Sequence, residues 1–370
     1  MRICLVSSAY RPYISGVGEH VHYLGRELQK LGHTVHILTT TYHGIRDSEC
    51  HPTTRLGKGF IIPFAKGEFT LPIAGNLAVQ VREFFSSNHF DIVHCHGIFP
   101  PELAYWSARY SPFPVVVTFH VVNPLLPRFI YSAFRALFTK LRNKLRAKIA
   151  VSRACQEWAA SFFPGKYWVI PNGVDFSIFH PGVKPALPPV QNHRLLFVGR
   201  LEKRKGLDYL FQALPAVLAS YPGTELVVVG FGPLKKYYQR LVKKLSIGKS
   251  VRFVGAVPNQ ELAGYYTGAT IYIAPTTGRE AMGIVLIEAM ACGLPVIASQ
   301  ITGYDEVIQN GVNGILVPPG KPEKLAEKII LLLGSETIRG KLSEQALIRA
   351  RDYEWSKIAR EVEKVYLTVS

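Results

Sequence analysis

The chain has 370 residues, of which 48% are hydrophobic and 19% charged, so intrinsic disorder is excluded and there is room for two folded domains. No apolar run approaches the roughly 18 residues that a membrane-spanning helix needs, and Met1-Arg2 leads directly into a predicted strand, so we expect neither a transmembrane helix nor a signal peptide. The net charge of +17 indicates an anionic partner, which could be a membrane surface, a nucleic acid or a phosphorylated substrate.

The first half of the chain alternates predicted strands with helical segments. Residues 2–8 are predicted to form a buried strand, and residues 17–31 a helix that Gly32 ends. Further strands are predicted at 33–41, 90–97, 114–120, 148–152 and 167–173. This alternation is typical of a parallel sheet in an α/β domain.

A basic segment lies inside this first half. Residues 103–156 contain nine Lys and Arg but no Asp or Glu. Within them, residues 128–148 are predicted to form a helix whose apolar stripe is Ile130, Phe134, Leu137, Leu141 and Leu145. The flanking cations are Arg128, Arg135, Lys140, Arg142, Lys144, Arg146 and Lys148. This composition favours an interfacial helix on anionic lipid, and the alternative is a helix packed on its own domain with a solvated basic edge.

The second half repeats the α/β pattern after a proline-rich stretch. Residues 176–193 contain four prolines and no periodicity, so we predict a linker at 179–193 between a domain of residues 1–178 and a domain of residues 194–352. Strands are predicted at 194–201, 224–232, 251–257, 270–275, 295–299 and 314–319. The final segment, 353–370, is predicted to be an amphipathic helix. Doubly wound sheets bind ligands beyond the C-terminal ends of their strands, and clefts between domains are favoured ligand sites.

Two carboxylates in the run TTGREAMGIVLIEAMACGLPVIAS are the most informative chemical feature. Glu280 and Glu288 are separated by seven residues, and Gly283 lies between them. If a helix begins near Gly283, its free backbone N–H groups favour a phosphate, while Glu288 lies about a turn and a half further in, within reach of a ribose. The alternative, a solvated helix with unrelated acids, is weakened because Glu280 stands in a loop of threonine and glycine.

This run resembles the signature of retaining glycosyltransferases of family four, which have the GT-B fold. The resemblance extends along the whole chain, and the other matching motifs occur in the expected order: Gly16-Val17 after the first strand, His120 at the end of PVVVTFH, Ile-Pro-Asn-Gly-Val-Asp at 170–175, and Val-Gly-Arg at 198–200 before Lys205-Gly206. In size and layout the chain is most similar to phosphatidylinositol mannosyltransferases. The resemblance implies two Rossmann-like doubly wound domains that face a central cleft, with residues 353–370 crossing back to the N-terminal, acceptor-binding domain.

The chemistry expected at such a site needs cations for the diphosphate of a sugar nucleotide. The chain contains no D-x-D element, so no metal and no cofactor are predicted, and Arg200 and Lys205 are predicted to converge on the phosphates. The resemblance places His120 near the transferred sugar, in an orienting and electrostatic role. The residues predicted to be catalytic are therefore His120, Arg200, Lys205 and Glu280. The predicted donor-binding residues are Gly16, Arg200, Lys205, Gly230, Glu280, Met282, Gly283, Ile284 and Glu288.

Several neighbours of these residues are interpreted as structural. Ser15 departs from the Gly-Gly pair of the family. Glu19 and His20 follow on the predicted helix and receive no role. His94 and His96 share one face of a strand and could suggest a metal, but the sequence shows no third ligand.

The resulting hypothesis is a metal-independent retaining hexosyltransferase. It would move mannose from GDP-mannose to a membrane lipid such as phosphatidylinositol, as a cytoplasmic protein held peripherally at the cytosolic face of the membrane. The first alternative is a UDP-sugar-dependent transferase with a soluble sugar or another non-lipid acceptor. The second is a non-catalytic protein that binds sugar nucleotides. Nucleic acid is not expected as a partner in the leading hypothesis, although the basic charge leaves it open as the acceptor of a rival one.

Overall fold

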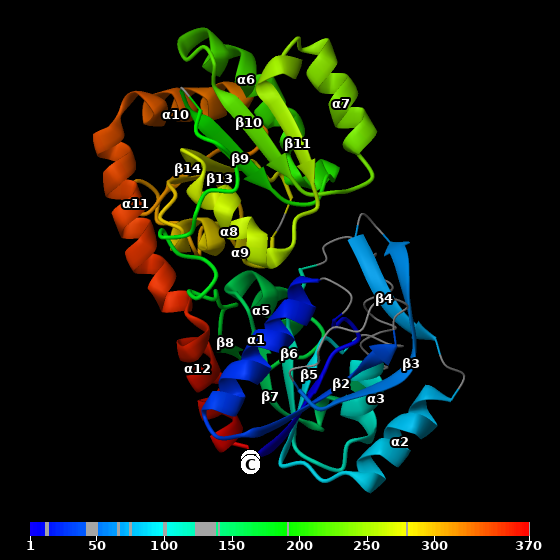
Figure 1. Ribbon diagram of the computed structural model, residues 1–370. Helices are drawn as coiled ribbons and strands as arrows, with labels where there is room; N and C mark the ends of the chain where they lie inside the picture. The colour runs from blue at the N-terminus through cyan, green and yellow to red at the C-terminus, as the bar shows by residue number, and fades with distance from the viewer. Residues whose placement is uncertain are drawn as a thin grey trace. The chain divides into compact units, whose positions relative to one another are not determined.

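The computed structural model describes residues 1–11, 15–41, 51–64, 67–73, 76–98, 102–122, 138–139, 141–190, 192–278 and 280–369. The chain divides into two compact units (Figure 1). Unit 1 comprises Met1–Gly173 together with Trp355–Ser370, and unit 2 comprises Val174–Glu354.

Unit 1 is built on a sheet of eight described strands in the order β4-β3-β2-β1-β5-β6-β7-β8. The strands are β1 (Arg2–Val6), β2 (Thr34–Thr41), β3 (Thr53–Phe64), β4 (Gly67–Ile73), β5 (Ile92–His96), β6 (Val115–Phe119), β7 (Leu145–Ala150) and β8 (Trp168–Val169). All neighbours are parallel except β3 and β4, which are antiparallel. The strand order reverses between β1 and β5, and this switch point is where a doubly wound sheet binds its ligands.

The helices of unit 1 pack in two groups. They are α1 (Gly16–Lys30), α2 (Leu77–Ser87), α3 (Leu103–Tyr110), α5 (Arg153–Ala160) and α12 (Trp355–Leu367). Helix α12 comes from the end of the chain and lies beside α1, and α2 lies beside α3 (Figure 1). Right-handed crossovers on either side of the switch point place α1 and α3 on opposite faces of the sheet. The side chains of β5 therefore alternate between the α1/α12 face, where His94 lies 2.6 Å from the Tyr366 hydroxyl, and a buried apolar cluster that includes Cys95.

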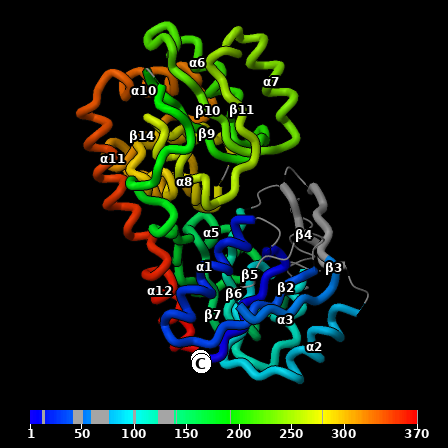
Figure 2. Tube along the Cα trace, viewed as in Figure 1, coloured from blue at the N-terminus to red at the C-terminus, as the bar shows by residue number. Residues whose placement is uncertain are grey.

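Unit 2 has a parallel sheet in the order β11-β10-β9-β12-β13-β14. Its strands are β9 (Arg194–Val198), β10 (Glu225–Val229), β11 (Val251–Gly255), β12 (Ile271–Ala274), β13 (Val296–Ser299) and β14 (Ile315–Val317). Its helices are α6 (Leu207–Ser220), α7 (Lys235–Lys244), α8 (Asn259–Thr267), α9 (Ile284–Ala291), α10 (Pro322–Gly334) and α11 (Glu336–Ala350), with 3-10 turns at Lys203–Lys205, Gly248–Ser250 and Arg351–Tyr353. The Cα trace shows α10 alongside α6 (Figure 2).

Most predicted strands are present, and the short apolar runs explain why. The inner strands of both sheets are buried on two faces, so they are continuous hydrophobic segments that are visible in a single sequence. The β3–β4 hairpin was not predicted. Gly57, Gly59 and Pro63 interrupt its apolar alternation, and these residues usually mark loops.

The segment predicted as a linker belongs to unit 2. The unit boundaries fall at Gly173/Val174 and Glu354/Trp355, whereas residues 179–193 pack on unit 2 without forming a helix or strand where they are described. The amide of Ala186 donates to the Gly264 carbonyl at 2.8 Å, and the Arg194 guanidinium donates to the Pro188 carbonyl at 2.8 Å. Proline prevents regular structure here, but these hydrogen bonds hold the segment in place.

The predicted basic helix at 128–148 is wrong at its C-terminal end. Residues Leu145–Ala150 form β7, paired with β6, so Arg146 and Lys148 lie on a strand. Arg128, Arg135 and Lys140 lie outside the described residues.

Three of the cations predicted to contact the membrane donate hydrogen bonds to backbone carbonyls within unit 1. The Arg142 guanidinium donates to the Phe162 carbonyl at 2.8 Å, the Lys144 ammonium to the Arg109 carbonyl at 2.6 Å, and the Lys148 ammonium to the Pro164 carbonyl at 2.6 Å. Arg146 is exposed. The helical stripe was misleading because Leu145, one of its apolar residues, belongs to strand β7. The sequence also does not show which backbone carbonyls accept hydrogen bonds from the cations.

Candidate active site

Glu280 lies in the loop before α9, and cations surround it. Helix α9 begins at Ile284, as predicted, with Gly283 before it in the left-handed region at φ 84°. The Glu280 carboxylate pairs with Lys205 Nζ at 2.7 Å and also with the Arg204 guanidinium. Burial alone would raise the pKa of this carboxyl, but Lys205 and Arg204 outweigh burial and lower it. Glu280 is therefore a fixed negative charge between two cations.

A series of ion pairs of alternating charge joins Arg200 and Lys205, the two residues predicted to bind the phosphates. Arg200 pairs with Glu202 at 2.5 Å, and Arg204 lies 3.7 Å from the same carboxylate and also pairs with Glu280. The structure thus connects Arg200 to Lys205 through Glu202, Arg204 and Glu280. Sequence analysis missed Glu202 and Arg204, although their position beside Lys205 was a signal. The three cations and two carboxylates carry a net positive charge, which suits an anionic ligand.

Two glycines let the backbone segments of this site approach closely. Gly206 follows Lys205 at φ 70°, and a Cβ there would lie 1.8 Å from the Pro275 carbonyl oxygen. Gly230, predicted to contact the donor, follows β10 at φ 136°, and a Cβ there would lie 1.9 Å from the Gly199 carbonyl oxygen. Both positions require glycine because side chains rarely adopt this backbone and no space is available. The structure therefore assigns Gly230 a packing function, independent of any contact with a ligand.

The α9 side of the site contains the second predicted carboxylate. Glu288 is 8% exposed, and the Tyr266 hydroxyl donates to its Oε2 at 2.8 Å. Ile284 is half-buried at the first turn of α9, whereas the Met282 side chain is 2% exposed and packs in the core of unit 2. Met282 can therefore offer a ligand its backbone but not its side chain.

In unit 1, Gly16, which was predicted to bind the donor, is the first residue of α1. Ser15 caps this helix, since its hydroxyl accepts a hydrogen bond from the Gly18 amide at 2.9 Å. The departure from a Gly-Gly pair is thus explained by helix capping. Glu19, one turn further, pairs with Arg11 at 3.2 Å.

His120 belongs to a cluster of four histidines at the C-terminal ends of β5 and β6. His96 Nδ1 lies 3.0 Å from His120 Nε2, and the His20 ring centroid lies 4.6 Å from that of His120. The His94 ring is tilted against that of His96, with the two centroids 4.3 Å apart. Sequence analysis treated His20 as structural, because nothing in the chain shows that α1 delivers it to this strand edge.

These histidines are neutral at physiological pH. Burial lowers the pKa of His20 to about 4 and that of His94 to about 3. Burial and the neighbouring imidazoles hold the pKa values of His96 and His120 well below the usual range. His120 can therefore orient a ligand or accept a proton, but it carries no positive charge near pH 7. Within the described residues, one nitrogen from each of His20, His96 and His120 lies within 4.8 Å of the others, so this set could hold a metal.

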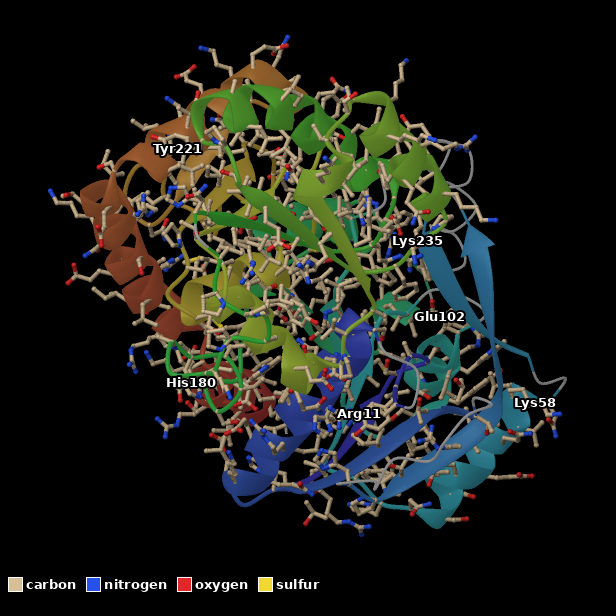
Figure 3. All side chains as sticks on the ribbon, turned by 45° about the horizontal axis from the view of Figure 1, so that its top comes forward. Arg11, Lys58, Glu102, His180, Tyr221 and Lys235 are labelled. Carbon is tan, nitrogen blue, oxygen red and sulfur yellow. The ribbon has the colours of Figure 1, made fainter. Side chains whose placement is uncertain are left out.

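One further carboxyl lies at the switch point of the unit 1 sheet (Figure 3). Glu102 precedes α3, and its Oε2 lies 3.4 Å from where a Cβ on Gly97 would stand, at the end of β5. The Ser8 hydroxyl, at the end of the neighbouring β1, accepts a hydrogen bond from the next amide, that of Leu103, at 3.2 Å. Burial raises the pKa of Glu102 to about 8. Sequence analysis missed it because the strand order that makes this place a switch point is a tertiary property.

Comparisons with known proteins identify the family. Residues 14–178 match the family described as Glycosyltransferase Family 4, and residues 184–349 match the family described as Glycosyl transferases group 1. The two matches together span most of the chain. The protein belongs to these glycosyltransferases.

Relatives and solved structures agree with this assignment. The chain is 29% identical to the phosphatidyl-myo-inositol mannosyltransferase of Mycobacterium leprae, over 100% of this chain and 97% of that protein. It is 27% identical to the alpha-monoglucosyldiacylglycerol synthase of Acholeplasma laidlawii, over 99% and 97%. Its fold matches sucrose-phosphate synthase from Thermosynechococcus elongatus with a TM-score of 0.79 at 23% identity, covering 99% and 98% of the two chains. It matches Anabaena HepE, solved with UDP and glucose, with a TM-score of 0.78 at 19% identity over 100% of both. The fold is GT-B, as expected from the sequence.

Proposed function

We propose that this glycosyltransferase transfers mannose from GDP-mannose to a membrane lipid, with retention of the anomeric configuration. The observation that carries the proposal is the net positive network of Arg200, Arg204 and Lys205 around Glu280, beside the N-terminus of α9. A sugar nucleotide presents a diphosphate for the cations and hydroxyl groups for the carboxylates. The names of the phosphatidyl-myo-inositol mannosyltransferase and of the alpha-monoglucosyldiacylglycerol synthase support a lipid acceptor.

The donor roles follow from charge and position. Arg200 and Lys205 neutralise the diphosphate in place of a metal, Glu280 orients the hexose, and Glu288 binds the ribose. In the transfer step, the bond between the anomeric carbon and the diphosphate oxygen breaks and its electron pair stays with the phosphate. The acceptor oxygen attacks the same face of the sugar and passes its proton to the leaving phosphate. Cations fixed where this negative charge develops lower the barrier.

The acceptor roles fall to unit 1. His120, neutral and at the end of β6, orients the transferred sugar. Glu102 lies at the switch point and offers a carboxyl to an acceptor hydroxyl. The exposed Arg146 contacts the anionic membrane surface, together with Arg128, Arg135 and Lys140 of the basic segment, which lie outside the described residues. Because the proposed acceptor is a membrane lipid, we propose peripheral binding at the cytosolic face. No helix among the described residues is long and apolar enough to span a bilayer.

A transfer assay with a matrix of donors and acceptors tests this proposal. The full-length protein is incubated with radiolabelled GDP-mannose or UDP-glucose, and with vesicles of phosphatidylcholine alone or with phosphatidylinositol or diacylglycerol. We expect labelled lipid from GDP-mannose and phosphatidylinositol only. Product from UDP-glucose would favour the alternative donor, which is supported by the HepE structure with UDP and glucose. Transfer to soluble sugars but never to lipid would refute the lipid acceptor.

A further inference from the structure

Unit 1 contains three imidazoles that converge although the chain separates them widely. His20 comes from α1, His96 is the last residue of β5, and His120 directly follows β6. The ring centroids of His96 and His120 are 5.3 Å apart, and that of His20 lies 5.2 Å from that of His96. One nitrogen from each ring lies within 4.8 Å of the others. The three rings thus surround one small volume at the edge of the sheet.

The hydrogen bonds fix which His20 nitrogen is available. His20 Nδ1 lies 2.9 Å from Asn172 Oδ1, and a side-chain amide oxygen only accepts hydrogen bonds. The proton of the neutral ring is therefore on Nδ1, and Nε2 has a bare lone pair. Within the described residues, this Nε2 is buried and has no hydrogen-bond partner. A histidine that donates one N–H to an oxygen and keeps the other nitrogen bare has the arrangement found in metal sites.

His96 shows a second buried nitrogen of this kind. Its Nδ1 lies 3.0 Å from His120 Nε2, while its own Nε2 is buried and has no hydrogen-bond partner among the described residues. A proton on that Nε2 would be an unsatisfied buried donor, which costs about 1–3 kcal/mol. The favoured tautomer therefore places the proton on Nδ1, toward His120, and leaves Nε2 bare. His20 and His96 thus each keep a buried nitrogen with a bare lone pair, which is the chemical form that ligates a metal.

We propose that His20, His96 and His120 bind one divalent transition metal of the zinc class. Three imidazoles and an open fourth position are an established ligand set for Zn²⁺, with Zn–N distances of about 2.0–2.1 Å. Small ring rotations would bring the nitrogens to such distances from a common centre. The set contains no carboxylate, so it selects imidazole-binding metals over Mg²⁺ or Ca²⁺. His120 is only half-buried, which leaves the fourth position accessible.

A buried hydrogen bond supports such a site. Asn172 is 5% exposed, and its side-chain oxygen holds the His20 ring in place, as hydrogen-bond partners behind a metal ligand do.

Metal binding has a functional consequence that rests on the proposed function. An imidazole that ligates a metal cannot also contact the transferred sugar, so Zn²⁺ is an inhibitor that competes for His120. This effect is separate from the diphosphate cations, which belong to unit 2. The affinity for metal and the inhibition can therefore be measured independently.

Metal titration of the purified full-length protein tests the site. We expect one equivalent of Co²⁺ to give the visible absorption of a tetrahedral nitrogen site, and Zn²⁺ to displace it. His20→Asn and His96→Asn should each weaken Zn²⁺ binding at least tenfold by calorimetry. His94→Gln is the matched control, because His94 is buried in the same cluster but lies outside the ligand set, and it should bind metal as the parent does.

Zinc-edge X-ray absorption of the loaded parent protein gives an answer that needs no variant. Three imidazoles and no sulfur in the first coordination shell would support the site. Absence of stoichiometric binding, a sulfur ligand, or equal binding by His20→Asn and His96→Asn would overturn it. Inhibition is read separately. If zinc binds at the three histidines but transfer continues, the role proposed for His120 fails and the metal site stands. An inactive parent that binds zinc there refutes only the proposed function.

Discussion

Acidification should destabilise unit 1 because His94 must remain neutral when folded. Its ring is fully buried, with Nδ1 2.6 Å from the Tyr366 hydroxyl and Nε2 2.7 Å from the Thr118 hydroxyl. Both hydroxyls can donate or accept, so burial rather than hydrogen bonding disfavours the charged ring. Burial, with a smaller effect of His20, lowers the pKa of His94 to about 3.

The size of the destabilisation follows from the difference between the pKa of His94 in the unfolded state and its pKa in the folded state. An unfolded histidine titrates near about 6.5 and is mostly protonated at pH 5, whereas folded His94 is still neutral there. The pKa of His94 is lower in the folded state than in the unfolded state. Its contribution to the free energy of unfolding is therefore fully present above the unfolded pKa and is lost as pH falls toward the folded pKa. Between pH 8 and pH 5 the loss is about 2 kcal/mol, and at pH 3 it is roughly 4 kcal/mol.

Urea unfolding followed by tryptophan fluorescence measures this loss in unit 1. The four tryptophans, at 106, 158, 168 and 355, all belong to unit 1, so fluorescence reports that unit alone. The parent should lose about 2 kcal/mol more free energy of unfolding between pH 8 and pH 5 than His94→Gln does. Comparing the two proteins cancels the contributions of other groups, including Glu102, whose raised pKa acts in the opposite direction. His89→Gln, at an exposed ring, should behave as the parent. An equal acid-induced loss in the parent and in His94→Gln would refute the reasoning.

Three further predictions concern the candidate active site. Arg200→Ala and Lys205→Ala should each reduce kcat roughly 100- to 1000-fold with unchanged circular dichroism, and near-normal turnover would remove these cations from the mechanism. Gly206→Ala should destabilise unit 2 by more than about 1 kcal/mol, because its φ is 70° and the new Cβ would meet the Pro275 carbonyl; an unchanged thermal midpoint would contradict this. Glu102→Gln should raise the KM for the lipid acceptor several-fold while the Kd for the donor is unchanged, and a shift in donor affinity instead would argue against acceptor binding.

The α/β architecture and the two carboxylates of the candidate active site, Glu280 and Glu288, could be predicted from the sequence alone. Strands buried on both faces are short apolar runs, which are local signals, and the loop-to-helix transition at Gly283 is also local. The family signature specified Arg200, Lys205, Glu280 and His120 in the same way, because each belongs to a contiguous motif.

The hydrogen-bond and ion-pair partners of the charged and polar side chains depend on tertiary structure. Arg204 and Glu202 join the predicted cations into one network, and His20 reaches the ends of β5 and β6, only because segments distant in sequence fold together. The basic segment is a case in which the local pattern predicted the wrong element. Its alternation of apolar and cationic residues suits a helix as well as a strand, and the pairing of β7 with β6, which is long-range, selected the strand. Local pattern fixes which residues can be buried, but sheet order and the packing of distant helices determine which of them become partners.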